Sequence, residues 1–299
     1  MKPFKANVMI MIVTLFWGSS YLFMKMGLDS VQPFNLIALR FGLAFIAAGS
    51  LFAGRLRRNT DASVLKHAAL LGFILFGVFA SIMLGLQGTS TSNAGFLMSL
   101  TVIFVPVLSA VFGKSMPSKR LVLGVLLAMT GIGLLTLRPQ SGIGFGDLWC
   151  ILGALLFAVH MMLTGRAAKT SPDPLCIGIW QLGFAGAFGL VFTVLWETPR
   201  LPGSISGWMA VLALSLVCSA LGFILQTMAQ QYTTATQAGL IFALEPVVAA
   251  VIGLLFMNET MSVQGYAGAG LVLLGVALSE LNVSRVLGRK KQPRREAAG

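Results

Sequence analysis

The chain has 299 residues, of which 57% are hydrophobic and only 10% are charged, and its mean hydropathy is +0.88. A soluble domain of this length carries roughly a quarter charged residues, so the composition excludes a soluble globular protein and indicates a polytopic membrane protein. The net charge of +12 would suit a nucleic-acid-binding protein. The distribution of the charges argues against nucleic acid as a partner, because it follows membrane topology instead.

Ten stretches are apolar and long enough to cross a bilayer, which needs about 20 residues. They fall at about 7–26, 33–53, 67–87, 93–113, 119–137, 147–166, 174–196, 207–227, 236–257 and 262–281. The connections between them are too short to hold a soluble domain. We therefore predict an all-α polytopic protein of ten transmembrane helices, followed by a basic cytoplasmic tail at 285–299 that is expected to be disordered.

The positions of Lys and Arg predict the orientation of the chain. If the N-terminus is cytoplasmic and the chain alternates, seventeen of the 21 Lys and Arg residues fall inside and three fall outside, and Arg40 alone lies within a span. This is the positive-inside pattern. We expect both termini to be cytoplasmic in a bacterial cytoplasmic (inner) membrane, with the basic loops contacting anionic lipid at most.

The two halves of the sequence resemble each other. Two offsets, 144 and 141 residues, relate them and differ by an ordinary loop deletion. Because each half contains five spans, an odd number, the second copy must enter the membrane from the opposite side, which is the inverted repeat of many secondary transporters. We predict a first repeat at 1–140 and a second at 141–284. The matched pairs are Asn93 with Gln237, Leu100 with Leu244, Gly124 with Gly268 and Gly131 with Gly275 at the first offset, and Phe16 with Phe157, Lys25 with Arg166 and Pro33 with Pro174 at the second.

Several short motifs, in order and in both halves, carry a family resemblance. They are Phe16-Trp-Gly-Ser-Ser-Tyr21 with Lys25, Pro33 to Arg40-Phe, Glu245-Pro246, Asn258-Glu259, and Gln264 with Gly268 and Gly275. Together they resemble the EamA family of the drug/metabolite transporter superfamily over essentially the whole chain. The resemblance implies a secondary transporter that exports amino acids or other small metabolites, with a central cavity lined by spans 1, 3, 4, 6, 8 and 9. The first repeat has Thr101-Val102 in place of Glu245-Pro246, which puts matched gating by the two repeats in doubt.

Glu245 and Pro246 lie near the middle of the ninth apolar stretch. A charge in hydrocarbon is expensive, so a carboxylate there normally faces a cavity or a partner, and the proline removes a backbone donor and loosens the helix. Glu245 is thus a candidate to carry a coupling proton or to contact a substrate ammonium, with Pro246 as a gate candidate. The alternative is a structural glutamate bonded to a neighbouring helix.

Arg40 is expected roughly 10 Å deep from the outer side, and Glu245 roughly 13 Å deep from the inner side, at 1.5 Å per helical residue. The two can therefore pair, or Arg40 can hold a substrate carboxylate through its planar fork. Arg40 can equally reach outward to lipid headgroups. Its repeat partner is Gln181, which keeps the polarity and not the charge.

Other polar residues within the spans are candidates for the same cavity. Trp17 and Tyr21 share a face of the first span, with Ser20 beside them, and can stack on a ligand or simply pack. His160 and Thr164 have the same spacing on the sixth span. In the eighth span Ser215, Ser219, Gly222 and Gln226 form a stripe that either lines the cavity or packs closely. Gln87, Asn93, Gln230 and Gln237 mark helix ends, where they act as caps or as gates.

The sequence favours a secondary transporter that exports a small metabolite by alternating access, with protons as a possible coupling ion. We find no nucleotide-binding signature and expect no cofactor, no metal and no catalysis. The alternative function is a lipid or lipid-linked substrate flippase, which would need basic residues at headgroup depth. A membrane-embedded enzyme would need an acid–base or metal-ligand cluster, and the two histidines, His67 and His160, lie far apart.

Overall fold

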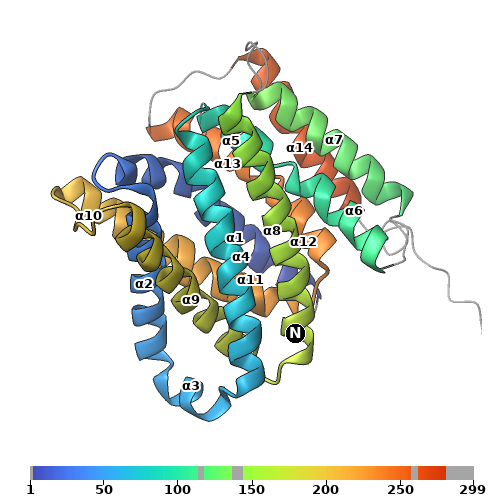
Figure 1. Cartoon of the computed structure of the whole chain (residues 1–299). Helices are drawn as coiled ribbons and strands as arrows, with labels where there is room; N and C mark the ends of the chain where they lie inside the picture. Colours follow the sequence, from blue (N-terminus) through green and yellow to red (C-terminus); the bar gives the residue numbers. More distant parts are fainter. Residues whose placement is uncertain (1–2, 90, 114–117, 137–143, 257–261, 281–299) are drawn as a thin grey trace, which may run out of the picture.

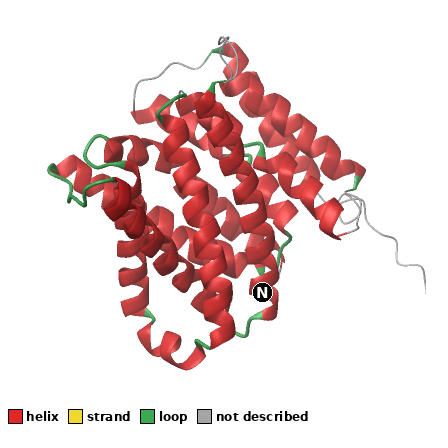
Figure 2. Ribbon diagram, viewed as in Figure 1, coloured by secondary structure: helices red, strands yellow, loops and turns green. Residues whose placement is uncertain are grey.

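The computed structural model describes residues 3–89, 91–113, 118–136, 144–256 and 262–280. Within these ranges every regular element is a helix (Figure 2). The helices are α1 (Pro3–Leu28), α2 (Pro33–Leu51), α3 (Ala53–Asn59), α4 (Ala62–Leu86), α5 (Thr91–Met98), α6 (Thr101–Gly113), α7 (Lys119–Thr136), α8 (Phe145–Thr170), α9 (Pro174–Trp196), α10 (Ile205–Leu212), the π-helix η1 (Ala213–Leu221), α11 (Gly222–Gln230), α12 (Ala235–Phe242), α13 (Glu245–Phe256) and α14 (Val263–Glu280).

The ten predicted spans coincide with these helices. Seven of them are single helices, while the fourth is α5 with α6, the eighth is α10, η1 and α11, and the ninth is α12 with α13. The short α3 is an addition that the hydropathy did not predict. The basic tail, 285–299, lies outside the described residues.

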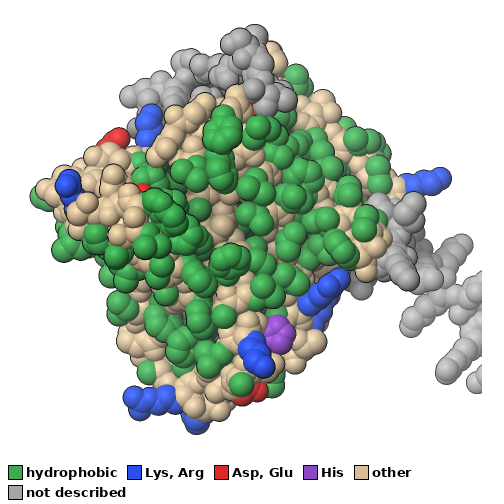
Figure 3. Space-filling model, viewed as in Figure 1, with side chains coloured by type: hydrophobic (Ala, Val, Ile, Leu, Met, Phe, Trp, Pro, Cys, Tyr) green, Lys and Arg blue, Asp and Glu red, His purple; other side chains and the backbone are tan. Residues whose placement is uncertain are grey.

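The outer surface of the bundle is apolar. Eight helical stretches are long and apolar enough to cross a membrane, and large side chains such as Phe73, Val194 and Leu212 are exposed on them. Figure 3 shows hydrophobic side chains over the middle of the visible face, with Lys and Arg at its margins. Because such a surface is stable only against hydrocarbon, the fold is that of an integral membrane protein.

Two of the spans are broken at equivalent positions. The fourth is interrupted at Ser99 and Leu100, and the ninth at Ala243 and Leu244, which are related by the first repeat offset. Pro246 follows the second break, but the first break occurs without a proline there. At that break Thr101 donates to the carbonyls of Met98 (2.7 Å) and Ala154 (3.2 Å). Broken helices at matching positions of two repeats are typical of transporter folds.

The fifth and tenth spans, α7 and α14, lie side by side at one edge of the molecule (Figure 1). Their glycines face backbone: a Cβ on Gly131 would stand 2.5 Å from the carbonyl oxygen of Gly268, and one on Gly275 would stand 2.5 Å from that of Gly124. These are the four glycines that the repeat offset pairs. The contact is therefore symmetric between the repeats, and it depends on small residues that let the two backbones approach closely.

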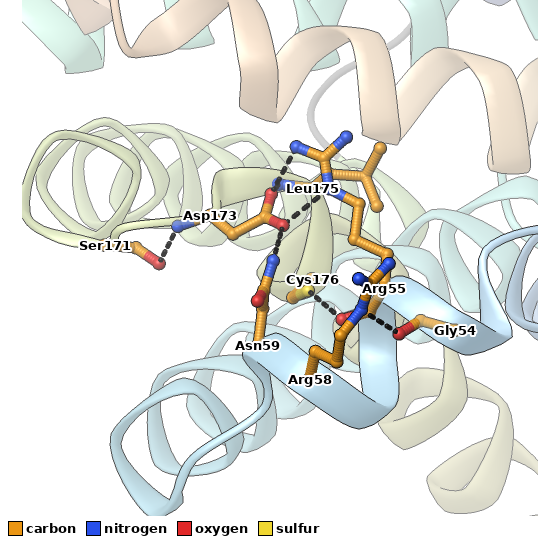
Figure 4. A network of polar contacts seen from close by, with 8 residues as sticks. All are labelled: Gly54, Arg55, Arg58, Asn59, Ser171, Asp173, Leu175 and Cys176. Atoms are coloured by element: carbon orange, nitrogen blue, oxygen red, sulfur yellow. Dashed lines mark hydrogen bonds and ion pairs between the residues drawn. The ribbon is translucent and has the colours of Figure 1, made fainter.

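Carboxylates at the two ends of the seventh span, α9, tie it to α2 and to α3, the short helix that follows α2. At one end Glu197, just after α9, accepts from the backbone N–H groups of Phe34 (2.9 Å) and Asn35 (2.8 Å) in the first turn of α2. At the other end Asp173, the N-cap of α9, pairs with Arg55 of α3, Nε to Oδ2 at 2.6 Å (Figure 4). Negative charge at a helix N-terminus is favourable, so each carboxylate stabilises one helix while it ties two helices together.

Candidate functional site

Trp17 of α1 lies at the centre of the bundle. It is 5% exposed and its ring is stacked on Phe242 of α12, with centroids 4.7 Å apart, and lies 4.9 Å from Phe223 of α11 and 5.6 Å from Phe157 of α8. Trp17 thus joins both repeats through aromatic contacts. A rigid ring cluster of this kind offers flat apolar surface beside any polar group that adjoins it.

A π-helix in the eighth span positions the indole. The N–H of Gly222 is directed to the carbonyls of Val217 and Ser219, so the carbonyl of Cys218, its partner in an α-helix, accepts from Trp17 Nε1 instead at 2.8 Å. A Cβ on Gly222 would stand 2.7 Å from that nitrogen, so the contact requires glycine. The sequence predicted a straight α-helical stripe here. The π-turn changes its register, so that Ser219 faces α2 while Gly222 faces α1.

Arg40 of α2 is directed inward. Its side chain is 1% exposed, so it does not reach to lipid headgroups. The Nε group donates to Ser219 Oγ at 2.6 Å, and the guanidinium lies over the Phe79 ring, 4.3 Å from the centroid. Among the described residues Nη1 has no hydrogen-bond partner. A buried cationic donor without a partner is costly and is suited to an anionic group of a ligand.

Glu245 begins α13, next to Tyr21 of α1. The two helices approach closely because Gly18 lies between them: a Cβ there would stand 2.6 Å from Val248 Cγ1 and 3.0 Å from the Glu245 carbonyl oxygen. The Tyr21 hydroxyl lies close to the Glu245 carboxylate, and Arg40 lies near enough for its charge to act on both groups. Tyr21 and Glu245 are only partly buried. The structure therefore brings together a cation, an anion and a phenol from α2, α13 and α1.

His160 of α8 belongs to a second polar group. Its Nε2 lies 3.1 Å from Gln181 Oε1 of α9, and Gln181 Nε2 donates to Thr227 Oγ1 of α11 at 3.2 Å. His160, Gln181 and Thr227 are all fully buried. Spacing predicted His160 and Gln181 as polar positions, but Thr227 was missed. Its signal was a polar residue inside an apolar span, one place after Gln226.

Buried polar atoms without partners are concentrated in these helices. Leaving such an atom unpaired costs about 1–3 kcal/mol, and native proteins contain few of them. A group of them therefore indicates bound water or a ligand. In the described part of the chain they are Arg40 Nη1, His160 Nδ1, Thr164 Oγ1, both amide atoms of Gln226, and Gln230 Oε1.

The other predicted residues lie outside this centre. Ser20 donates to the carbonyl of Trp17 in its own helix at 2.8 Å. Pro246 is buried, and Gln87 is an exposed C-cap of α4. Gln237 lies in the first turn of α12, where its Oε1 accepts from Thr233 Oγ1 at 3.2 Å. Asn93 lies in the first turn of α5, and its side chain is outside the described residues.

The sequence model of the EamA-like transporter family matches the chain twice, over residues 4–137 and 144–281. The chain belongs to this family. The EamA resemblance found in the motifs is thereby confirmed, and this EamA protein is a membrane transporter. Each of the two matches covers one copy of the five-span unit, which agrees with the broken helices and glycine contacts that the two copies share.

Similar proteins point the same way. A protein of Archaeoglobus fulgidus named an uncharacterized transporter is 29% identical, over 94% of this EamA chain and 88% of its own. The uncharacterized transporter YyaM of Bacillus subtilis is 27% identical, over 92% and 93%. A solved crystal structure superposes with a TM-score of 0.79, at 21% identity, over 95% of this chain and 99% of the other, which supports the fold alone.

Proposed function

We propose that this EamA protein is a secondary transporter that exports a small zwitterionic metabolite, an amino acid or a related compound, across the bacterial cytoplasmic membrane. The observation that carries the proposal is the juxtaposition of Arg40 with Glu245 and Tyr21 beside the Trp17 rings. The free Nη1 group of Arg40 suits a substrate carboxylate, bound through a charge-assisted hydrogen bond. Glu245 suits the substrate ammonium.

The placement of this group supports alternating access. Glu245 stands at the first residue of a half-helix, where the ninth span is broken, and Arg40 and Ser219 come from the second and eighth spans. A ligand bound there contacts both repeats. Rocking of one repeat against the other then opens the group to either side in turn, as in other inverted-repeat transporters. The distribution of Lys and Arg favours cytoplasmic termini, and we propose that the substrate moves outward from the cytoplasm.

Glu245 is also the candidate for proton coupling. When a proton occupies its carboxylate, Glu245 no longer offers a full negative charge to a substrate ammonium or to Arg40. Proton and substrate ammonium therefore compete for one group, which couples their movements in opposite directions. In a facilitated transporter the same residue would bind substrate without exchanging protons.

Counterflow in proteoliposomes tests the proposal. Vesicles are preloaded with unlabelled amino acids and other metabolites, and uptake of labelled counterparts is followed with and without a pH gradient. We expect exchange of amino acids. In Glu245→Gln, gradient-driven uptake should be lost, while exchange should persist at a raised half-saturating concentration because the substrate ammonium loses its counter-charge. Glu197→Gln, the same change at the end of α9, is the matched control and should keep both activities.

Other outcomes separate the alternatives. Exchange that ignores pH and survives in Glu245→Gln would make the protein a facilitated transporter with a structural glutamate. If no soluble metabolite exchanges, the metabolite proposal fails. Movement of a fluorescent phospholipid between leaflets of the same vesicles would then identify a flippase.

A further inference from the structure

Gln181 holds in the second repeat the position that Arg40 holds in the first. Each is the eighth residue of a helix that begins with proline, Pro33 in α2 and Pro174 in α9. Each is fully buried, and each bonds to the eighth span, Arg40 to Ser219 and Gln181 to Thr227. In an inverted repeat, equivalent residues lie at mirrored depths. Gln181 therefore marks a second polar level on the opposite side of the midplane.

The aromatic cluster around Trp17 separates the level of Arg40 from the level of Gln181. Phe223 of α11 packs against Trp17 and lies between Ser219, at the Arg40 level, and Gln226. From Ser219 to Gln226 is seven residues, roughly 10 Å along a helix. Gln226 is thus clear of the group formed by Arg40, Tyr21 and Glu245, on the side predicted to face the cytoplasm.

Four side chains with unpaired atoms gather at this second level. His160 and Thr164 are one turn apart on α8, and Gln226 and Gln230 are one turn apart on α11. The two helices meet there, because Gln230 Nε2 donates to the carbonyl of Met161 at 3.2 Å. All four side chains are 0% exposed. Each keeps at least one polar atom without a partner, and Gln226 keeps both.

Thr164 shows that these free groups are not a by-product of helix geometry. A buried threonine in a helix commonly donates to the carbonyl four residues earlier, as Thr14, Thr193 and Thr227 do at 2.9, 2.7 and 2.7 Å. The Thr164 hydroxyl has no such bond. The hydroxyl therefore remains free to bond to a ligand at the contact between α8 and α11.

We propose that His160, Thr164, Gln226 and Gln230 form a second binding subsite, which takes an uncharged group that both donates and accepts hydrogen bonds, such as a carboxamide. The proposal rests on the transport function above and extends it to the selection of the substrate's side chain. Two carboxamides, an imidazole and a hydroxyl supply donors and acceptors without a countercharge. A charged group there would lose its hydration without a partner of opposite sign. Gln181 acts as a positioning residue that holds the His160 ring through Nε2.

Cysteine accessibility tests whether the subsite faces the transport path. In a background with Cys150→Ala, Cys176→Ala and Cys218→Ser, single cysteines are placed at Thr164 and Gln226. Reaction of the full-length protein with N-ethylmaleimide is then followed in proteoliposomes. Ala158→Cys is the matched control, because Ala158 is equally buried and lies on the opposite side of α8 from His160. We expect Thr164→Cys and Gln226→Cys to react at least tenfold faster, and rates equal to the control would overturn the proposal.

Small probes test the chemistry of the subsite. Excess acetamide should slow modification of Thr164→Cys at least threefold, whereas acetate should leave it unchanged; equal effects would overturn the assignment to a neutral group. In counterflow, Gln226→Leu should raise the half-saturating concentration of glutamine about tenfold and change that of leucine less than twofold. Thr164→Val serves the same comparison if Gln226→Leu does not fold.

These results are separable from the transport proposal. If wild-type protein exchanges no amino acid but acetamide protects Thr164→Cys, the proposed substrate is wrong and the subsite stands. If amino acids are exchanged but the Thr164 and Gln226 cysteines react like Ala158→Cys, the transport function stands. The subsite proposal then fails, and its four residues belong to the packed interior of the protein.

Discussion

Trp17 donates its indole N–H to the main-chain carbonyl of Cys218, 2.8 Å away, on a span of the other repeat. The bond is available because the π-helix directs the Gly222 N–H elsewhere. The contact is returned by Cys218, whose Sγ donates to the carbonyl of Phe16 at 3.2 Å. The π-turn interrupts the regular helix hydrogen bonds and thereby holds the Trp17 ring in one position. Such turns are frequent at functional sites.

Gly222→Ala should destabilise the protein through this contact. The new Cβ would stand 2.7 Å from Trp17 Nε1, so the indole must move and its bond is lost, at about 1–3 kcal/mol. Thermal unfolding in detergent measures the loss. Gly42→Ala is the control, because a Cβ on Gly42 meets nothing within 4 Å. Since Trp17→Phe removes the same bond, the double variant should cost clearly less than the sum of the single variants; additive losses would contradict the mechanism.

Arg40 and Glu245 should be coupled energetically. Arg40→Met removes a buried charge and leaves Glu245 without the cation that acts on it, which should cost about 3 kcal/mol. Adding Glu245→Gln should recover part of that loss, because the unpaired carboxylate is then absent. A double-mutant cycle on thermal stability measures the coupling. If the double variant is less stable than Arg40→Met alone, the two charges do not support each other.

Asp173 should matter more for stability than its partner Arg55. Asp173 is 4% exposed and accepts from Arg55, Asn59 and the Leu175 N–H, whereas the Arg55 side chain is 50% exposed. Asp173→Ala removes the cap of α9 and leaves Asn59 without its bond, so we expect a loss of about 2 kcal/mol. Arg55→Ala should cost less than about 1 kcal/mol, since the exposed charge is screened. Equal losses would place the stabilisation in the ion pair instead.

The same network predicts a pH dependence. Burial alone would raise the pKa of Asp173, but hydrogen bonds from Arg55 and Asn59 hold it below its usual value of 3.8. A depressed pKa adds stability that is fully present above the unfolded-state value and is lost as pH falls through the folded-state value. When the pH is lowered below about 4, the midpoint temperature of unfolding should therefore decrease more in the wild type than in Asp173→Asn. Parallel curves of unfolding midpoint against pH for the two proteins would contradict this role of Asp173.

Glu197→Ala should loosen the opposite end of the α2–α9 pair. It removes the acceptor of two backbone N–H groups at the start of α2, at a cost of about 1–2 kcal/mol. Glu197→Gln keeps an acceptor oxygen and should cost less. Hydrogen exchange at Phe34 and Asn35 measures the effect directly, and unchanged protection in Glu197→Ala would show that the cap does not hold the helix.

The sequence by itself determined the fold. Hydropathy placed the ten spans, and the repeat offset paired Gly131 with Gly275 and Leu100 with Leu244. These features are readable because each depends on local composition and length, or on a repeat that both halves preserve. The EamA resemblance was readable for the same reason. Arg40, Glu245, His160 and Gln226 were also recognisable, since a polar residue in an apolar span is costly wherever it packs.

Only the tertiary structure decided what these residues contact. Spacing along one helix could not show that Arg40 bonds Ser219, that Tyr21 reaches Glu245, or that Gln181 holds His160, because each pair joins helices far apart in the chain. The π-turn was hidden as well, since it follows from the fit of Trp17 against Gly222 and not from a local preference. The separation into a charged group and a neutral group depends on which faces the helices turn inward, and packing sets those faces.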